Sequence, residues 1–180
     1  KEGKKWITRL PFPVHCISKT SVEDKIRETV FTSSYRYRHG YFDHHEREFR
    51  GFARVDQLDT EVFSQFKVNG ASNVVEEDLH QPPVRTVSWF HTGAYLRNTK
   101  ILHQCESEYF SNDDFAEYDL PEPIFANDLS LRELREAHRA CKGIPLRTET
   151  YAEDNSDKSA YPYSASQSTV EIRKIPVSYT

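Results

Sequence analysis

The sequence has 180 residues, with 24 Lys and Arg against 28 Asp and Glu, so its formal net charge is −4 at pH 7. This balance excludes a protein that binds nucleic acid through its overall charge, and no apolar run approaches the roughly 20 residues of a membrane-spanning helix. We therefore expect no nucleic-acid partner and no direct membrane insertion. Aromatic residues make up 13% of the chain, although its mean hydropathy is only −0.76. This combination favours sheets with one buried and one solvated face.

The length fits one domain over residues 1–180, and the sequence predicts that this domain is a segment of a longer polypeptide. It begins at Lys1 and contains no Met, so it has no initiator residue. The cysteines are odd in number and have no metal-like spacing, which favours buried thiols over disulfides or a zinc site. They are Cys16, Cys105 and Cys141.

The residues before the first long strand are expected to be irregular. Two prolines make residues 10–14 an extended segment that lies along an edge. Charged residues dominate positions 21–29, and we interpret them as a turn that leads to a strand near Val30.

A β-hairpin is predicted over residues 35–61. Aromatic and histidine side chains alternate with arginines in its first half, which places them on opposite faces of a strand. The polar break at 43–46 predicts the hairpin loop. Gly40 and Gly51 are typical of a bulge in a sheet that curves. The expected sheet residues are Tyr35, Tyr37, Tyr41, Phe49, Arg50, Gly51 and Phe52.

The remaining strands are less sharply marked than the hairpin. Residues 101–110 fit a strand or a short helix equally well, and 111–122 are expected to form a long ordered loop. Further strands are predicted over residues 84–91, 146–152 and 169–175.

One α-helix is predicted over Leu131 to Lys142. Ser130 and Glu133 have the spacing of a capping box, and Gly143 can take the left-handed position after the last turn. Apolar positions recur at helical spacing between these signals. The residues expected to dock the helix are Leu131, Leu134 and His138.

Two constellations could carry chemistry, and both have a plainer interpretation. His39, His44 and His45 lie beside acidic residues and could bind a metal in a hydrolase, but neighbouring side chains of an extended strand point apart. We therefore favour a solvated hairpin tip. The alternating Tyr and Arg side chains could bind a glycan or a protein, yet cross-strand pairs with nearby acids explain them better. No established catalytic motif appears, so we expect no enzyme and no cofactor.

Several stretches resemble the middle region of the B component of bacterial insecticidal Tc toxins, the TcaC/TcdB-like proteins that are associated with RHS and YD repeats. The block EREFRGF at residues 46–52 is the most specific of them. The other similar stretches are residues 6–14, 35–43, 53–61, 82–96, 106–110, 131–154 and 161–174.

This resemblance implies a mainly β fold with one helix, in which a curved antiparallel sheet is a segment of an RHS-type β-shell. In such toxins the B and C components form a hollow shell that encloses the cytotoxic part of C, and a propeller in B joins the shell to the A component. The implied partners are therefore the rest of the B chain, the C component and, indirectly, the A component. The self-cleaving and toxic residues belong to C, which implies a structural role for this segment within a secreted complex.

Overall fold

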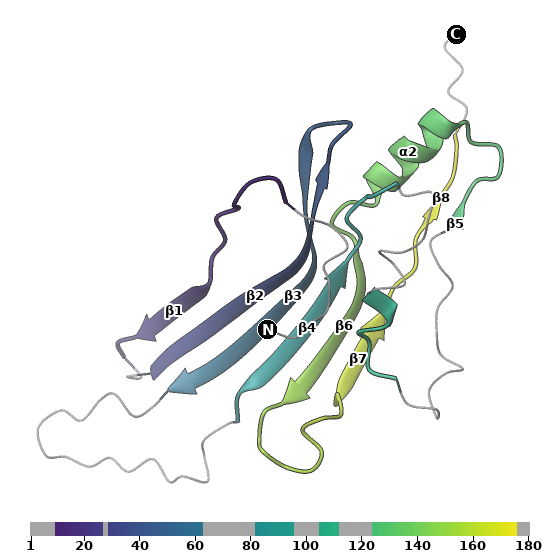
Figure 1. Cartoon of the computed structure of the whole chain (residues 1–180). Helices are drawn as coiled ribbons and strands as arrows, with labels where there is room; N and C mark the ends of the chain where they lie inside the picture. The colour runs from purple at the N-terminus through teal and green to yellow at the C-terminus, as the bar shows by residue number, and fades with distance from the viewer. Residues whose placement is uncertain (1–9, 27–28, 63–81, 96–104, 112–123, 176–180) are drawn as a thin grey trace, which may run out of the picture.

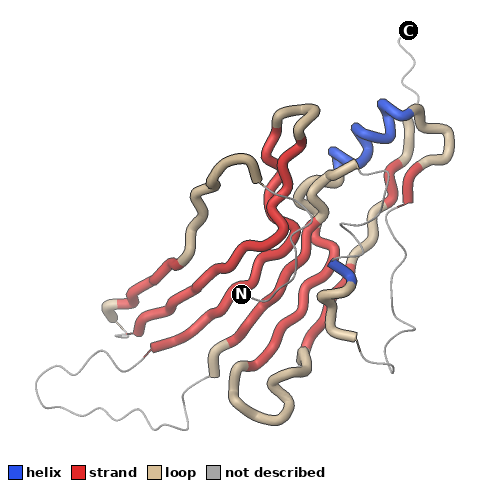
Figure 2. Tube along the Cα trace, viewed as in Figure 1, coloured by secondary structure: helices blue, strands red, loops and turns tan. Residues whose placement is uncertain are grey.

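The computed structural model describes residues 10–26, 29–62, 82–95, 105–111 and 124–175, and it is built around one twisted antiparallel sheet (Figure 1). Six strands pair in the order β1-β2-β3-β4-β6-β7, and a separate parallel pair joins β5 to β8. Figure 2 shows α2 beyond one end of the sheet, beside the β5–β8 pair. The elements are β1 (Lys19–Asp24), β2 (Thr29–Asp43), β3 (Glu48–Val62), β4 (Val84–Phe90), β5 (Ile124–Phe125), α2 (Leu131–Ala140), β6 (Pro145–Ala152), β7 (Ser164–Gln167) and β8 (Glu171–Ile172).

The predicted class, mainly β with one α-helix and an antiparallel sheet, is confirmed in the described residues. The hairpin of β2 and β3 is longer than the predicted pattern, with fifteen residues in each strand. Its loop, residues 44–47, lies one residue beyond the predicted break at 43–46, and Asp43 Oδ1 accepts hydrogen bonds from the backbone N–H groups of His45 and Glu46. The carboxylate therefore holds the turn closed.

Several elements differ from the expectations. Residues 19–24 form strand β1 against β2 rather than a turn, because Val22 and Phe31 face each other across an antiparallel register that local charge does not reveal. The short strands β5 and β7 were not predicted, and β8 covers only two residues of the expected strand 169–175. The loop expected at 111–122 lies almost entirely outside the described residues.

The helix α2 follows its predicted start closely and ends earlier than predicted. Both hydrogen bonds of the capping box between Ser130 and Glu133 are present. The helix ends at Ala140, because the N–H groups of Cys141 and Lys142 bond three residues back, to His138 and Arg139, and Gly143 takes a left-handed φ of 82°.

The predicted bulge lies opposite Tyr41. The register between β2 and β3 shifts by one residue there, so that Arg50 and Gly51 oppose a single partner. Gly51 has φ 94°, and a Cβ atom at this position would meet nothing within 4 Å. The requirement for glycine is therefore conformational rather than steric.

We expect the substitution Gly51→Ala to lower the free energy of unfolding by about 1–3 kcal/mol, because alanine must then adopt a backbone region that it strongly disfavours. Gly51→Asn should lose less, since asparagine tolerates left-handed backbone better than alanine. Urea unfolding of both variants measures the difference. Equal losses would show that the bulge does not depend on the left-handed conformation.

The two faces of the sheet differ in chemistry, and the cross-strand registers define them. The covered face carries arginines, acids and large aromatic residues, and its central rows are Arg36-Asp56-Val87-Glu149-Ala165 and Arg38-Arg54-Trp89-Arg147-Gln167. The opposite face, here called the hydroxyl face, carries Tyr35, Gln57, Thr86, Thr150 and Ser164 in one row and Tyr37, Val55, Ser88, Thr148 and Ser166 in the next.

The core is small and lies where residues 105–111 approach the covered face. Trp89 and Cys105 are 1% exposed, and Tyr109 packs against the buried cluster. The other members of this cluster are Ala53, Val87, Leu146 and Tyr151. None of the helices described is long and apolar enough to span a membrane.

Candidate functional site

Two carboxylates fasten residues 105–111 to the covered face, and the first of them belongs to the segment itself. Glu108 Oε1 lies 2.8 Å from His39 Nε2, and its Oε2 accepts a hydrogen bond of 2.8 Å from Arg54 Nη1. Arg54 also donates to Asp56, which forms an ion pair with Arg38. Burial acts to raise the pKa of Glu108, but its bonds with His39 and Arg54 lower that pKa to about 2. The carboxylate therefore remains charged at neutral pH.

The second carboxylate, Glu149, lies on β6 and is fully buried. It accepts hydrogen bonds from Arg147 Nε at 2.6 Å, from the Tyr151 hydroxyl at 2.6 Å and from the backbone N–H of Phe110 at 2.9 Å. Arg147 Nη2 also donates to the Phe110 carbonyl. Burial and the bond to Glu149 raise the pKa of Tyr151 well above its usual range. Both backbone polar groups of Phe110 are thus paired with the sheet.

Aromatic rings fill the space between these two carboxylates. Trp89 and Tyr109 meet edge to face with their centroids 4.9 Å apart. The Arg54 guanidinium lies 5.2 Å from the Trp89 ring centroid, and that of Arg147 lies 5.0 Å from the Tyr109 centroid. Each arginine therefore bonds a carboxylate and also covers an aromatic ring. This arrangement uses the Arg and aromatic side chains to hold one segment of the chain on another.

We expect Glu108→Gln to loosen the attachment of residues 105–111 to the sheet. A neutral amide then stands in place of the carboxylate, and its two hydrogen bonds lose the contribution of that charge. The amide of Phe110 reports on it directly, since that N–H group is bonded to Glu149. Its hydrogen exchange should accelerate about tenfold or more, which corresponds to a loss of at least ~1.4 kcal/mol of local stability.

Glu106→Gln provides the matched control, because Glu106 lies in the same segment with an exposed side chain. Exposed charges contribute little, so Phe110 exchange should hardly change in that variant. Equal acceleration in the two variants would contradict a specific role for Glu108.

The bulge residue Arg50 joins the hairpin to the end of β4. Its side chain is buried, its Nη1 donates to the Gly93 carbonyl, and its Nη2 lies 2.7 Å from Asp43 Oδ2. Glu48 in turn accepts a hydrogen bond of 2.8 Å from Lys142 Nζ, beyond the C-terminus of α2. These interactions between charged side chains connect the hairpin, the end of β4 and the end of the helix.

The predicted aromatic sheet residues lie near one another in the hairpin. The Tyr37 hydroxyl donates to the Ile17 carbonyl, and the Tyr37 and Phe52 rings are 5.1 Å apart. Phe49 and Phe52 meet edge to face at 5.4 Å. Tyr35 and Tyr41 are half-buried, and burial raises the pKa of Tyr41.

The three candidate metal ligands are not brought together. His44 and His45 are exposed at the hairpin tip, whereas His39 is buried and bonds Glu108. His39 is predicted on the face of Tyr35 and Tyr37, but its left-handed φ of 56° breaks the alternation, so it reaches the same carboxylate as Arg54. The described residues hold no group of three His, Cys, Asp or Glu side chains that could bind a metal ion.

The docking residues expected on α2 are placed unequally. Leu131 is 63% exposed, which contradicts its predicted role in docking the helix. It is the first residue of α2 and lies before the part of the helix that is buried. Leu134 and His138 are half-buried, and Ala137 is buried. His138 lies 4.3 Å from the Phe125 ring, so it packs the helix against β5.

A second histidine, which sequence reasoning did not identify, lies at the same junction. His91 is 4% exposed, its backbone bonds Ile144 and Gly143, and its ring lies 5.9 Å from that of His138. Its Nδ1 accepts from the Gly93 N–H group, and its Nε2 has no hydrogen-bond partner within the described part of the chain. Burial, and then proximity to His138, lowers the pKa of His91 to about 4.

Glu108 and Glu149 were also missed, for different reasons. A signal existed for Glu149, because alternation places Arg147, Glu149 and Tyr151 on one face of a predicted strand. None existed for the pairing of Glu108 with His39, which are 69 positions apart.

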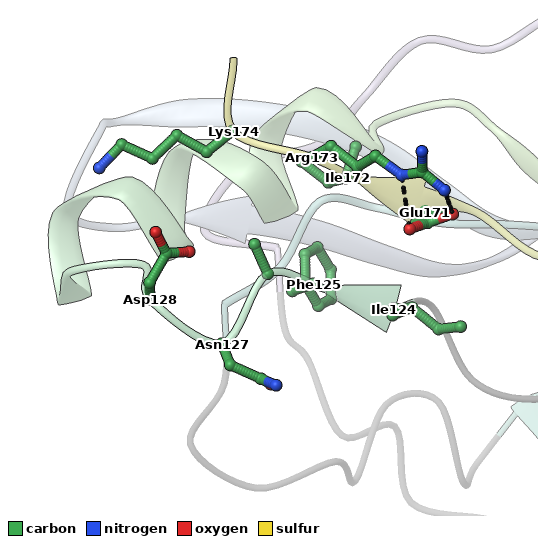
Figure 3. A pocket seen from close by; sticks show the side chains of 9 residues that line it. Ile124, Phe125, Asn127, Asp128, Glu171, Ile172, Arg173 and Lys174 are labelled. Carbon is green, nitrogen blue, oxygen red and sulfur yellow. Dashed lines mark hydrogen bonds and ion pairs between the residues drawn. The ribbon is translucent and has the colours of Figure 1, made fainter. Parts of the chain in front are cut away.

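A pocket of about 480 Å³ lies between β5 and β8 (Figure 3). Ile124 and Phe125 line its apolar side. Arg173 bonds its neighbour Glu171 through two contacts of 2.7 and 2.8 Å, so the charges along this stretch of the lining compensate each other. The pocket therefore brings no convergent set of acid, base and nucleophile together.

Comparison with known proteins shows similarity to one toxin family. The family model described as "Insecticide toxin TcdB middle/N-terminal region" matches residues 1–93, which are 93 of the 180 residues, and that of the "middle/C-terminal region" matches residues 136–180. The comparison with curated proteins returned no match.

Three solved structures are similar over almost the whole chain. The crystal structure of TcdB2-TccC3 shares 28% identity over 99% of this chain, with a TM-score of 0.77. That of TcdB2-TccC3-Cdc42 shares 28% over 94%, with a TM-score of 0.75. A Tc holotoxin pore from Photorhabdus luminescens shares 28% over 90%, with a TM-score of 0.67.

The chain spans only 7–8% of the length of these matched chains. The match extends to the sheet, the hairpin and the helix, since it covers nearly all of the sequence. Together with the family models, these similarities show that the chain belongs to the family of insecticide toxin TcdB middle regions.

Proposed function

We propose that the chain is a non-catalytic wall segment of a Tc toxin B component, which helps to build a hollow β-shell that encloses and delivers a cytotoxic effector. The observation that carries this proposal is the arrangement of the sheet. Residues 105–111 cover one of its faces, and its two edge strands, β1 and β7, have no outer partner among the described residues. Such edges are suited to continue into neighbouring strands. Similarity to a small part of much longer chains supports the same conclusion.

The interactions of the covered face also favour a structural role. The guanidinium groups of Arg54 and Arg147 are engaged by carboxylates and rings of the same chain, which leaves them poorly placed to bind a glycan. A network of this kind rigidifies a wall without supplying a reactive group.

The proposed partners are the rest of the B chain and the C component, with the A component joined indirectly through a propeller in B. One similar structure pairs TcdB2 with TccC3, and another is a Tc holotoxin pore, which supports partners of these classes. The proposed location is extracellular, as part of a secreted toxin complex.

Substitution at the edge strand β1 tests the proposal. Tyr35 N donates to the Ser18 carbonyl, so in the alternating antiparallel pattern the N–H group of Ser21 points away from β2. Ser21→Pro removes this outward donor and also the hydroxyl that lies 3.2 Å from the Thr32 hydroxyl. Ser21→Ala removes the same hydroxyl but keeps the outward N–H group, so it serves as the matched control.

In the complex of the full B chain with its C component, we expect Ser21→Pro to make the enclosed effector sensitive to protease, while Ser21→Ala leaves it protected. Protection that is equal in both variants would contradict pairing of this edge within a closed wall.

A further inference from the structure

The hydroxyl face combines small polar side chains with little charge. Across β3, β4, β6 and β7 its two central rows present one amide, one valine and six hydroxyl groups. Asp59 lies in the next row, where Ser33 and Gln57 donate hydrogen bonds to its carboxylate. The side chains of Ser164 and Ser166 are exposed, and those of Ser88 and Thr148 are half-buried.

The covered face is chemically the opposite. It carries four arginines in two adjacent rows together with Asp56 and Glu149. Residues 105–111 already contact its centre through Glu108 and the backbone of Phe110. The sheet is therefore asymmetric, because the arginines of these rows and the covering segment lie on the covered face, whereas the carboxylate of Asp59 lies on the hydroxyl face.

An uncharged hydroxyl surface has a definite physical consequence for a polypeptide beside it. Hydroxyl and amide groups exchange hydrogen bonds with water at little net gain, and so they do not select a partner by charge. Beyond the half-buried rings of Tyr35 and Tyr37 on β2, the face also supplies little apolar area on which a chain could be buried. Such a face tolerates polypeptides of different sequence and offers none of them a core to fold around.

We propose that the hydroxyl face is the inner surface of the wall and contacts an enclosed, unfolded effector polypeptide, while the covered face points outward. This inference rests on the proposed function, since it requires a closed shell. It assigns to Ser88, Thr148 and Ser166 a contact with the guest chain that is weak and independent of its sequence.

Site-specific photo-crosslinking in the assembled complex of the full B chain with its C component tests the inference. The photoreactive residue p-benzoylphenylalanine replaces Thr148 on the hydroxyl face, or Arg36, an exposed residue on the opposite face, as the matched position. Protease protection of the effector is measured on each complex before irradiation, which shows that the shell has closed.

We expect a crosslink to the effector from position 148 and none from position 36. A crosslink from position 36 alone, or from neither position although the effector is protected, would overturn the assignment of the inner face and leave the wall proposal intact. An effector that is unprotected in the unsubstituted complex would instead overturn the proposed function.

Discussion

Glu149→Ala is expected to lower the free energy of unfolding by about 3–5 kcal/mol, the typical loss when one partner of a buried ion pair is removed. The substitution leaves three donors without their acceptor inside the protein: the Arg147 guanidinium, the Tyr151 hydroxyl and the Phe110 amide. Arg147, which is largely buried, loses its ion pair of 2.6 Å with Glu149. Urea unfolding followed by circular dichroism measures the change.

Glu153→Ala provides the control for this prediction. Glu153 pairs with Arg85 at the end of the same strand, but its side chain is 41% exposed. We expect that variant to lose no more than about 1 kcal/mol. A loss at Glu149 that is no larger than the loss at Glu153 would show that the buried network does not hold the fold together.

Acidification from pH 6.5 to pH 4 is expected to cost about 3 kcal/mol of stability through His91. Burial and the neighbouring His138 hold the pKa of His91 at about 4 in the folded chain, against an ordinary value of 6.5. The unfolded chain therefore binds more protons in this window, so the free energy of unfolding rises with pH. The contribution is complete above about pH 6.5 and disappears as the pH falls toward 4.

The cations near His91 are paired with carboxylates. Arg50, which bonds the Gly93 carbonyl, lies 2.7 Å from Asp43, and Lys142 lies 2.8 Å from Glu48. Burial lowers the pKa of His138 too, so His138 contributes to the pH dependence in the same direction. Burial and the neighbouring His138 therefore favour the neutral form of His91.

His91→Asn separates the contribution of His91 from the others, because the asparagine oxygen can still accept the Gly93 N–H bond. We expect this variant to lose most of the slope of stability against pH between 4 and 6.5. The slope below pH 4.5 should persist in it, because Glu108 titrates there with a pKa of about 2 and loses its stabilising charge as the pH falls. An unchanged slope between pH 4 and 6.5 would exclude His91 as its source.

The sequence predicted best those elements that local chemistry determines. The capping box at Ser130 and the left-handed Gly143 are signals within a few residues, and they mark α2 at both ends. Alternation and the glycine at position 51 likewise gave the hairpin and its bulge. These features needed no knowledge of distant parts of the chain.

Features that depend on distant contacts were not predictable in the same way. Strand β1 exists because it pairs with β2, although its own residues read as a charged turn. His39 faces Glu108 because one left-handed residue reverses the alternation of its strand. Leu131 follows the helical pattern of a buried side chain, yet it lies in the first turn of α2 and is 63% exposed.

Hydrogen exchange at the two edge strands of the sheet is the most direct test of whether this sheet continues into the wall of a shell. Amides of β1 and β7 are compared between the 180-residue chain alone and the complex of the full B chain with its C component. We expect the outward amides of Ser21 and Ala165 to exchange rapidly in the isolated chain and to become strongly protected in the complex. Equally rapid exchange in both would contradict that continuation.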